Sequence, residues 1–168
     1  AISSYLEGES VTDFKNELFD NEAAFMEKEA FLFFSCDFSG IQKFIYKVGS
    51  KNALKSLRSR SFFLELLMEY FADELLNACG MSRANILYTG GGHCYLLLPN
   101  TKECRERLTE FEKAVNKWLT EQFGTSLYLG CAWTRGCANA RQNKPLGESR
   151  YPAIYKRLSR EISARKLR

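Results

Sequence analysis

The sequence of 168 residues has little histidine and proline and no long apolar segment. It contains 1 histidine and 3 prolines, and none of its apolar runs approaches the roughly 20 residues that a membrane-spanning helix needs. Its 6 cysteines include no Cys-x-x-Cys pair, so we expect no zinc site. No basic start followed by an apolar stretch and a cleavage site is present, so we expect reduced thiols and a cytoplasmic protein without a membrane partner.

The composition is that of one folded domain. Hydrophobic residues make up 45% of the chain and aromatic residues 14%, which excludes disordered and collagen-like classes. A chain of this length buries roughly 70% of its unfolded surface, so it needs no disulfide for stability. Because the chain starts at Ala1 rather than at Met and its last residues have a helical pattern, we expect it to be a piece of a longer protein.

The net charge of +4 is unevenly distributed along the chain. Residues 1–50 hold 9 acidic and 4 basic side chains, whereas the remainder holds 11 acidic and 20 basic ones. This asymmetry is compatible with a polyanionic partner for the C-terminal part. Ordinary solvated helix faces are the alternative, and charge alone does not decide between them.

Hydrophobic spacing predicts an α+β fold. The continuous apolar run at 30–37 is typical of a strand buried on both faces. Further strands are expected at 85–89, 94–98 and 127–133, and helices at 41–48, 53–79, 101–123 and from 154 onward. The resulting order is βαββαβ, a ferredoxin-like sheet with extra helices, which also frames the palm of nucleotidyl cyclases and polymerases. The fold alone does not assign a function.

We expect three segments along the chain. Residues 1–29 are acidic and carry aromatic residues at roughly helical spacing, which indicates a connector from a preceding domain that packs its aromatic side chains against something else. Residues 30–150 contain the predicted sheet. Residues 151–168 form a basic helix that leads to a linker.

The first candidate site lies where the first strand ends. Asp37 closes that strand, and Phe38, Ser39 and Gly40 lead into a short helix. Backbone N–H groups and a hydroxyl at a helix start suit a phosphate, and a carboxylate at a strand end suits Mg²⁺. Asp37 is therefore the candidate metal ligand. In the alternative interpretation, Ser39 or Asp37 serves only as a cap of the helix, and Gly40 serves only to permit close packing of the helix on the sheet.

The second candidate site is the hairpin formed by Gly90, Gly91, Gly92 and His93. Two glycines suffice for a tight hairpin, and a third removes every side chain from its tip, so a flat ligand can approach the backbone. Alternatively, the glycines only form a turn and His93 is an ordinary strand residue. In a palm domain this hairpin lies beside the end of the first strand, so the two candidates would form one site.

Three ordered segments carry a resemblance to one family. They are residues 34–46 (FSCDFSGIQKFIY), 53–63 (ALKSLRSRSFF) and 86–100 (ILYTGGGHCYLLLPN). Together they closely resemble the first palm, or cyclase-like (GGDEF-like), domain of the large signature subunit of type III-A CRISPR interference (Csm) complexes. The resemblance covers nearly the whole chain.

This resemblance implies a multidomain antiviral defence protein. In that family an N-terminal HD nuclease domain cleaves single-stranded DNA, and two palm domains clasp ATP and join it into cyclic oligoadenylates. Mg²⁺ or Mn²⁺ accompanies the ATP, and target RNA paired to guide RNA activates both reactions. The implied partners are therefore the other Csm subunits, the guide and target RNA, and the second palm domain of the same chain.

The departures from the family pattern indicate a non-catalytic half. The sequence contains no His-Asp pair and no Gly-Gly-Asp-Asp motif, because its hairpin reads Gly-Gly-Gly-His. A two-metal phosphoryl-transfer site needs several carboxylates, and Asp37 alone cannot supply them. We therefore expect no catalytic residue in this chain. By the resemblance, Phe38, Ser39 and Gly40 would face the triphosphate, and the hairpin would border the base or ribose.

Several alternatives stay open at this stage. Arg58 and Arg60 are candidate phosphate or RNA contacts, or solvated residues of a helix. Two alternatives concern the chain as a whole. One is a stand-alone diguanylate-type cyclase homologue, against which the missing acidic hairpin counts. The other is a structural or RNA-binding module. Because palm domains pair in the family, we expect the isolated chain to expose an apolar partner surface and to self-associate.

Overall fold

The computed structural model describes residues 1–8, 10–46, 53–141 and 151–166. Its core is a four-stranded sheet in the order β2-β3-β1-β4, in which every neighbouring pair is antiparallel. The strands are β1 (Phe31–Ser39), β2 (Ile86–Gly90), β3 (His93–Pro99) and β4 (Tyr128–Gly136). With helices between β1 and β2 and between β3 and β4, this is the expected ferredoxin-like βαββαβ arrangement of the α+β class.

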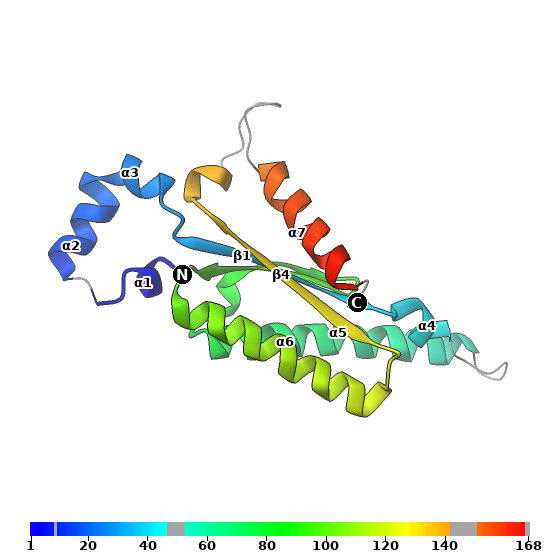
Figure 1. Cartoon of the computed structure of the whole chain (residues 1–168). Coiled ribbons are helices and arrows are strands. Elements are labelled where there is room, and N and C mark those ends of the chain that lie inside the picture. Colours follow the sequence, from blue (N-terminus) through cyan, green and yellow to red (C-terminus); the bar gives the residue numbers. More distant parts are fainter. Residues whose placement is uncertain (9, 47–52, 142–150, 167–168) are drawn as a thin grey trace.

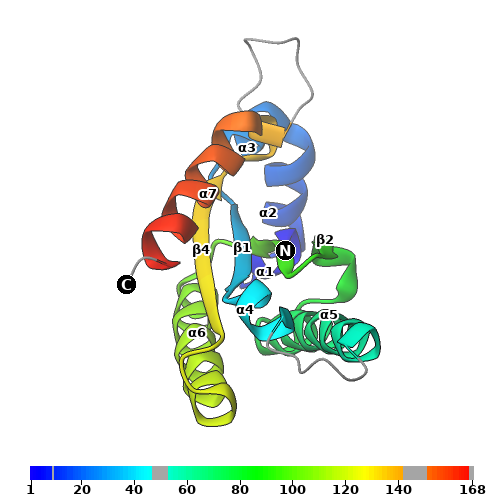
Figure 2. The same cartoon turned by 90° about the vertical axis from the view of Figure 1, so that its right-hand side faces the viewer.

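Helices cover both faces of the sheet (Figures 1 and 2). The long helices α5 (Ala53–Ala78) and α6 (Lys102–Phe123) pack on one face, and α7 (Tyr151–Lys166) packs on the other. As a consequence, β1 is buried along almost its full length. Its even-numbered side chains, such as Phe34, face α5 and α6, whereas odd-numbered ones, such as Phe33, lie in the cluster with α7. Burial on both faces explains the continuous apolar run.

The N-terminal segment is helical. It contains α1 (Ile2–Tyr5), α2 (Val11–Lys15), one π-helical turn (Asn16–Asp20) and α3 (Glu22–Glu27). Phe25 is buried in the cluster on the α7 side of the sheet, as expected for an aromatic residue of a packed connector. Phe19, in contrast, is 73% exposed in this chain, so the packing of its side chain stays a prediction.

The ends of the two long helices are fixed by capping groups. The Thr101 hydroxyl accepts a hydrogen bond from the Cys104 N–H at 3.1 Å, so Thr101 is the N-cap of α6, as predicted. Gly80, with φ of +66°, follows the C-cap of α5. Its N–H bonds to the Asn77 carbonyl, and the Met81 N–H bonds to the Leu76 carbonyl, which together form a Schellman motif.

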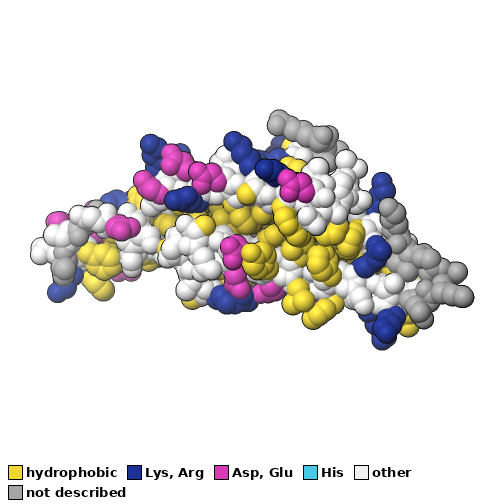
Figure 3. Space-filling view, turned by 90° about the horizontal axis from the view of Figure 1, so that it is seen from below, with side chains coloured by type: hydrophobic (Ala, Val, Ile, Leu, Met, Phe, Trp, Pro, Cys, Tyr) yellow, Lys and Arg dark blue, Asp and Glu magenta, His cyan; other side chains and the backbone are white. Residues whose placement is uncertain are grey.

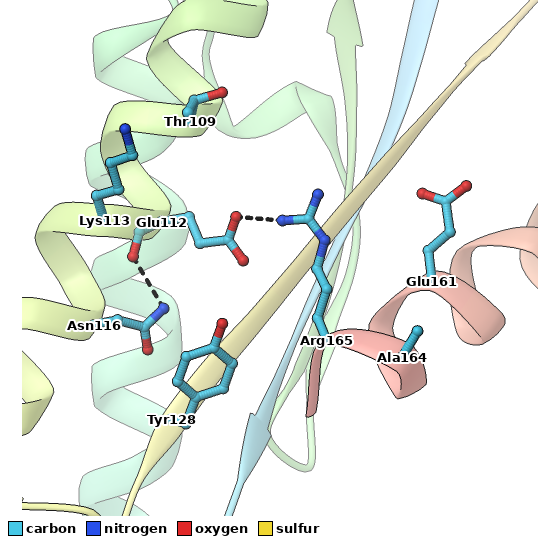
Figure 4. A pocket seen from close by; sticks show the side chains of 8 residues that line it. All are labelled: Thr109, Glu112, Lys113, Asn116, Tyr128, Glu161, Ala164 and Arg165. Atoms are coloured by element: carbon cyan, nitrogen blue, oxygen red, sulfur yellow. Dashed lines mark hydrogen bonds and ion pairs between the residues drawn. The ribbon is translucent and has the colours of Figure 1, made fainter. Parts of the chain in front are cut away.

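Besides its apolar packing on the sheet, helix α7 contacts α6 and β4 through the charged side chain of Arg165. Arg165 forms an ion pair with Glu112 of α6, and its guanidinium lies 5.3 Å from the ring centre of Trp133 of β4. The ion pair borders a cavity of about 560 Å³ (Figure 4). This engagement accounts for one of the basic side chains of the terminal helix within the domain itself.

Three cysteines lie side by side in the sheet. Cys36 of β1 is paired in register with Cys94 of β3 and with Cys131 of β4, and all three are buried. They behave as the small hydrophobic residues that their apolar sequence context predicts. Within the described parts of the chain, no helix has the length and apolar character that crossing a bilayer requires.

Short and peripheral elements depart slightly from the sequence-based expectation. Helix α4 (Ile41–Tyr46) is described over six residues. The last helix begins at Tyr151, a turn earlier than the expected start at 154. A single turn of 3₁₀ helix precedes β2 (Arg83–Asn85) and another follows β4 (Ala138–Arg141).

Candidate functional site

The end of β1 and the glycine hairpin lie against each other. Asp37 and His93 are register partners on β1 and β3, and the Phe38 N–H donates a 3.0 Å hydrogen bond to the Gly92 carbonyl. The sequence offered these two motifs separately, and the antiparallel pairing of β1 with β3 brings them together. The resulting edge is the candidate site.

Its polar centre is the contact between His93 and Asp37. The Nε2 atom of His93 lies 3.5 Å from Oδ1 of Asp37, and the side chains are 45% and 12% exposed. Burial lowers the pKa of His93 below its usual value, so the imidazole is neutral at pH 7 despite the nearby carboxylate. A neutral ring that faces a carboxylate carries its proton on Nε2. The contact is therefore a long polar one rather than an ion pair.

Two polar atoms near this contact lack partners. The Nδ1 atom of His93 and the hydroxyl of Ser35 are buried and, among the described residues, have no hydrogen-bond partner. Buried polar atoms are usually paired, and unpaired ones call for a physical reason. One such reason is a hydrogen-bonding group of a ligand or partner that would pair with these atoms.

Gly40 has a structural role. Its φ is +87°, and a Cβ atom there would lie 2.0 Å from the carbonyl oxygen of Ser126, in the turn before β4. The glycine therefore permits the close approach of the β1–α4 turn to this second turn. The interpretation of Gly40 as a packing residue has direct support in the geometry. A phosphate contact from Ser39 or Gly40 stays a prediction.

The three glycines of the hairpin differ in what surrounds them. A Cβ atom at Gly92 would lie 2.4 Å from the end of the Ile41 side chain, so Gly92 lets α4 cover the base of the hairpin. At Gly90 the nearest atom would be the Tyr88 hydroxyl, at 2.8 Å. Gly91 has φ of +59° and no atom within 4 Å of such a Cβ, and it is exposed. The tip of the hairpin is thus open.

A cavity of about 380 Å³ adjoins the hairpin on the α5 side of the sheet, whereas the side chains of Asp37 and His93 meet on the α7 side. It is lined by backbone of the hairpin and by side chains of α5: Phe62, Glu65, Leu66, Met68, Glu69, Thr89, Gly90 and Gly92. The pKa of Glu69 is lowered because Thr89 and Arg83 donate hydrogen bonds to its carboxylate. Apolar side chains and carboxylates in one pocket favour a base with exposed N–H groups over a triphosphate.

The contribution of α5 was missed by the sequence reasoning. Phe62 is 61% exposed and Leu66 is 53% exposed, although both fall within the helical hydrophobic pattern. That pattern marks which residues are apolar, but not which of them the rest of the fold covers. The sequence signal that could have indicated this surface is that the 26-residue helix has more apolar residues than one buried face needs.

Other predicted site residues lie apart from the open tip. The Phe38 side chain is buried and its ring packs on Phe71 with ring centres 6.1 Å apart, while its backbone N–H contacts the hairpin. Arg60 donates a 2.6 Å hydrogen bond to the Phe44 carbonyl and lies over the Phe44 ring. Arg60 thus fastens α4 to α5, and Arg58 is exposed on the same helix.

The described residues do not by themselves form a metal centre. Among them, no three His, Cys, Asp or Glu side chains are grouped so that they could hold an ion. Asp37, the candidate ligand, has its carboxylate beside a histidine rather than beside another acid. Mg²⁺ and Mn²⁺ prefer several oxygen ligands, so a metal that accompanies a nucleotide here would need carboxylates from outside this chain.

Comparisons with known proteins identify the family of the chain. The family model described as Csm1 subunit domain B matches residues 30–168. The curated CRISPR system single-strand-specific deoxyribonucleases Cas10/Csm1 (subtype III-A) of Mycobacterium tuberculosis and Streptococcus thermophilus are 44% and 42% identical over 99% of this chain. The chain spans 22% of the length of each, so it corresponds to about a fifth of these relatives.

Solved structures of the same family share the fold. The crystal structure of Csm1 from T. onnurineus has a TM-score of 0.77 and 35% identity, over 84% of this chain and 20% of that chain. A Csm1–Csm4 cassette in complex with pppApA has a TM-score of 0.83 and 30% identity, over 99% of this chain and 22% of that chain. The sheet and helices that position the candidate site, the matching family model and these relatives lead to one conclusion: the chain belongs to the Csm1 family and corresponds to its domain B.

Proposed function

We propose that this chain is the non-catalytic palm domain of a type III-A Csm1 subunit. It forms one wall of an ATP site that a second palm domain completes for cyclic oligoadenylate synthesis. One observation carries the proposal: the hydrogen bond from Phe38 to Gly92 joins the end of β1 to an open glycine tip beside a pocket of about 380 Å³. The single-strand DNase named for the relatives belongs, in this proposal, to another part of the protein.

Nucleotide binding is supported by what the related structures contain. Csm1–Csm4 cassettes have been solved in complex with one ATP and with AMPPNP, and these chains are 34% and 33% identical to this one. In the present chain, the exposed backbone at Gly91 lets a flat base approach, and the pocket beside it offers the carboxylate of Glu65 to exocyclic N–H groups. The hairpin and α5 are therefore the proposed wall for the base.

The number of carboxylates at the site supports the proposed absence of catalysis. Phosphoryl transfer with two metal ions needs several acids to hold the ions at the reacting phosphates. Here the hairpin presents Gly91, Gly92 and His93, and Asp37 is the lone acid at the end of β1. The role left to this chain is to bind and orient the nucleotide, while the acids come from the second palm domain.

The proposed position of the second domain is the apolar surface of α5. Hydrophobic side chains gather on the face of the molecule that carries α5 and α6 (Figure 3). Phe62 and Leu66 belong to this surface and also line the pocket beside the hairpin. A domain that closes the nucleotide pocket therefore also covers them. The relatives are about five times as long as this chain, so they have ample sequence for such a domain.

The wider partners follow the family. The related structures are complexes of Csm1 with Csm4, and we propose that this chain likewise works with Csm4 and the other Csm subunits. Guide RNA paired to target RNA is the proposed activator. The proposed contact with RNA is helix α7, which carries exposed basic side chains such as Lys156 and Arg160. Its Arg165 already forms an ion pair with Glu112.

The test uses the full-length Csm1 protein that carries this sequence. Gly91→Asn places a side chain at the open tip, and asparagine tolerates the left-handed backbone. The matched control is Gly80→Asn, which has a similar φ of +66° and equally open surroundings, but lies at the end of α5. We expect Gly91→Asn to weaken ATP binding about tenfold by calorimetry and to lower oligoadenylate yield, whereas Gly80→Asn leaves both unchanged.

Two further arms separate the parts of the proposal. His93→Ala is expected to reduce ATP affinity, and unchanged affinity and oligoadenylate yield would remove His93 from the site. If Gly91→Asn and Gly80→Asn behaved alike, the hairpin would not be the nucleotide wall. Oligoadenylate or cyclic dinucleotide made by the 168-residue chain alone would contradict its non-catalytic role and favour the cyclase alternative.

A further inference from the structure

Two cysteines outside the sheet face each other at the junction of α5 and α6. The Sγ atoms of Cys79 and Cys104 lie 3.6 Å apart, which is van der Waals contact between two thiols. Cys79 is the C-cap of α5, and Cys104 is in the first turn of α6. Although 25 residues separate them in sequence, the two long helices bring them together.

The backbone of both residues is held by the capping groups described above. The Schellman bonds around Gly80 fix the turn that contains Cys79. The hydroxyl of Thr101 binds the N–H of Cys104 itself. Each cap is local and fixes the backbone of its own cysteine, while the arrangement of α5 and α6 brings the two sulfur atoms together.

These thiols also differ from the three cysteines of the sheet in access and charge. Both line a cavity of about 1020 Å³, which Arg107 also lines. A hydrogen bond from Cys104 and the charge of Arg107 lower the pKa of Cys79, against the effect of its burial. In the sheet, the hydrogen bond with Cys36 and burial raise the pKa of Cys94 far above its usual value. Cys79 therefore carries the thiolate character.

We propose that Cys79 and Cys104 are a peroxide-reactive dithiol, with Cys79 as the attacking thiol and Cys104 as the resolving one. The Cys79 thiolate attacks one oxygen of a hydroperoxide, the O–O bond breaks, and Cys79 becomes a sulfenic acid while water or an alcohol leaves. The Cys104 sulfur then attacks the Cys79 sulfur and expels the hydroxyl, which leaves as water after protonation. Both sulfurs are oxidised by one electron each, and the peroxide takes up the two electrons.

The product joins the C-terminal end of α5 covalently to the N-terminal end of α6. Closing a loop of this length restricts the unfolded chain, and the native geometry requires little rearrangement because the sulfurs are already in contact. We therefore expect oxidation to raise the melting temperature, by roughly 5 °C, and reduction with dithiothreitol to reverse the rise.

Peptide mapping tests the proposal directly. The protein is treated with hydrogen peroxide, alkylated and digested with trypsin without reduction. Trypsin places the two cysteines in separate peptides, 61–83 and 103–105. We expect these peptides to be disulfide-linked, and Cys36, Cys94 and Cys131 to remain alkylatable only after unfolding. These three buried thiols are the internal control.

Two variants establish the order of events. In Cys104→Ser, the sulfenic acid at Cys79 has no resolving thiol, so dimedone should trap it on peptide 61–83. In Cys79→Ser, oxidation of Cys104 should be at least tenfold slower than that of the wild-type pair. Oxidation of the sheet cysteines at the same rate as Cys79, or failure of the linked peptides to form, would overturn the proposal.

Discussion

The side chain of Asn116 on α6 binds both backbone groups of Leu129 on β4. Its Oδ1 accepts a hydrogen bond from the Leu129 N–H at 2.8 Å, and its Nδ2 donates one to the Leu129 carbonyl at 2.9 Å. Since β4 is an edge strand, these groups point away from its partner β1. The amide thus replaces a neighbouring strand and protects the edge of the sheet.

Removing this amide should destabilise the domain. Asn116→Ala leaves two partly buried backbone groups without partners, and we expect the free energy of unfolding to fall by about 2 kcal/mol. Gln122→Ala, at an exposed position on the same helix, is the control and should change it by less than about 0.5 kcal/mol. Urea unfolding followed by circular dichroism measures both. Equal losses would mean that the edge is held by other groups.

Gly40 should be among the least replaceable residues. A methyl group there meets the backbone of Ser126, which cannot rotate away as a side chain can, and the backbone has positive φ. We expect Gly40→Ala to lower the free energy of unfolding by about 3 kcal/mol or more. Gly91→Ala introduces the backbone strain but no clash, so its free energy of unfolding should fall by about 1 kcal/mol. A similar loss in both variants would argue against the close approach.

The protonation of His93 can be followed directly, because it is the only histidine in the chain. Its pKa is lowered by burial, so an NMR titration of the imidazole should give a value below 6.5. A value at or above 6.5 would mean that attraction to Asp37 outweighs burial. With the lowered pKa, the unfolded chain binds more protons than the folded one, so this contribution to stability is present above pH 6.5 and is lost on acidification through the folded pKa. In His93→Gln, this part of the fall should be absent.

The isolated chain should self-associate through α5. Without a covering domain, Phe62 and Leu66 stay exposed, and a second copy is the available apolar partner. Light scattering should give a mass that rises with protein concentration, and Phe62→Lys combined with Leu66→Lys should suppress the rise. Phe19→Lys removes an even more exposed aromatic residue from the other end of the molecule and serves as the control. A monodisperse wild-type monomer at high concentration would contradict this prediction.

The parts of the fold that the sequence predicts well are those with strong local signals. The run at 30–37 indicates a doubly buried strand because Ser35 is its only polar residue before Asp37, and Thr101 marks the start of α6 by its own side chain. Such signals depend on neighbours a few residues away. The spacing between strands then restricts the topology to the ferredoxin-like arrangement.

The site was less predictable because its geometry depends on contacts between distant segments. The sequence left two interpretations of Gly40 open, and only its distance from Ser126 identifies the packing role. In the same way, the charge of Arg60 suggested a phosphate contact, whereas in the fold its guanidinium donates a hydrogen bond to the Phe44 carbonyl. The exposure of Phe62 was not predictable from helical spacing, since spacing does not say which apolar residues remain uncovered.

The bond between Phe38 and Gly92 bears on how rigid the hairpin is. Three consecutive glycines would normally form a loop with many accessible conformations, and ordering such a loop around a ligand would weaken binding. Here, the base of the hairpin is tied to β1 and covered by Ile41, so only the tip at Gly91 keeps open surroundings. Most of the conformational entropy of this loop is therefore lost when the domain folds, and the hairpin is preorganised before any nucleotide arrives.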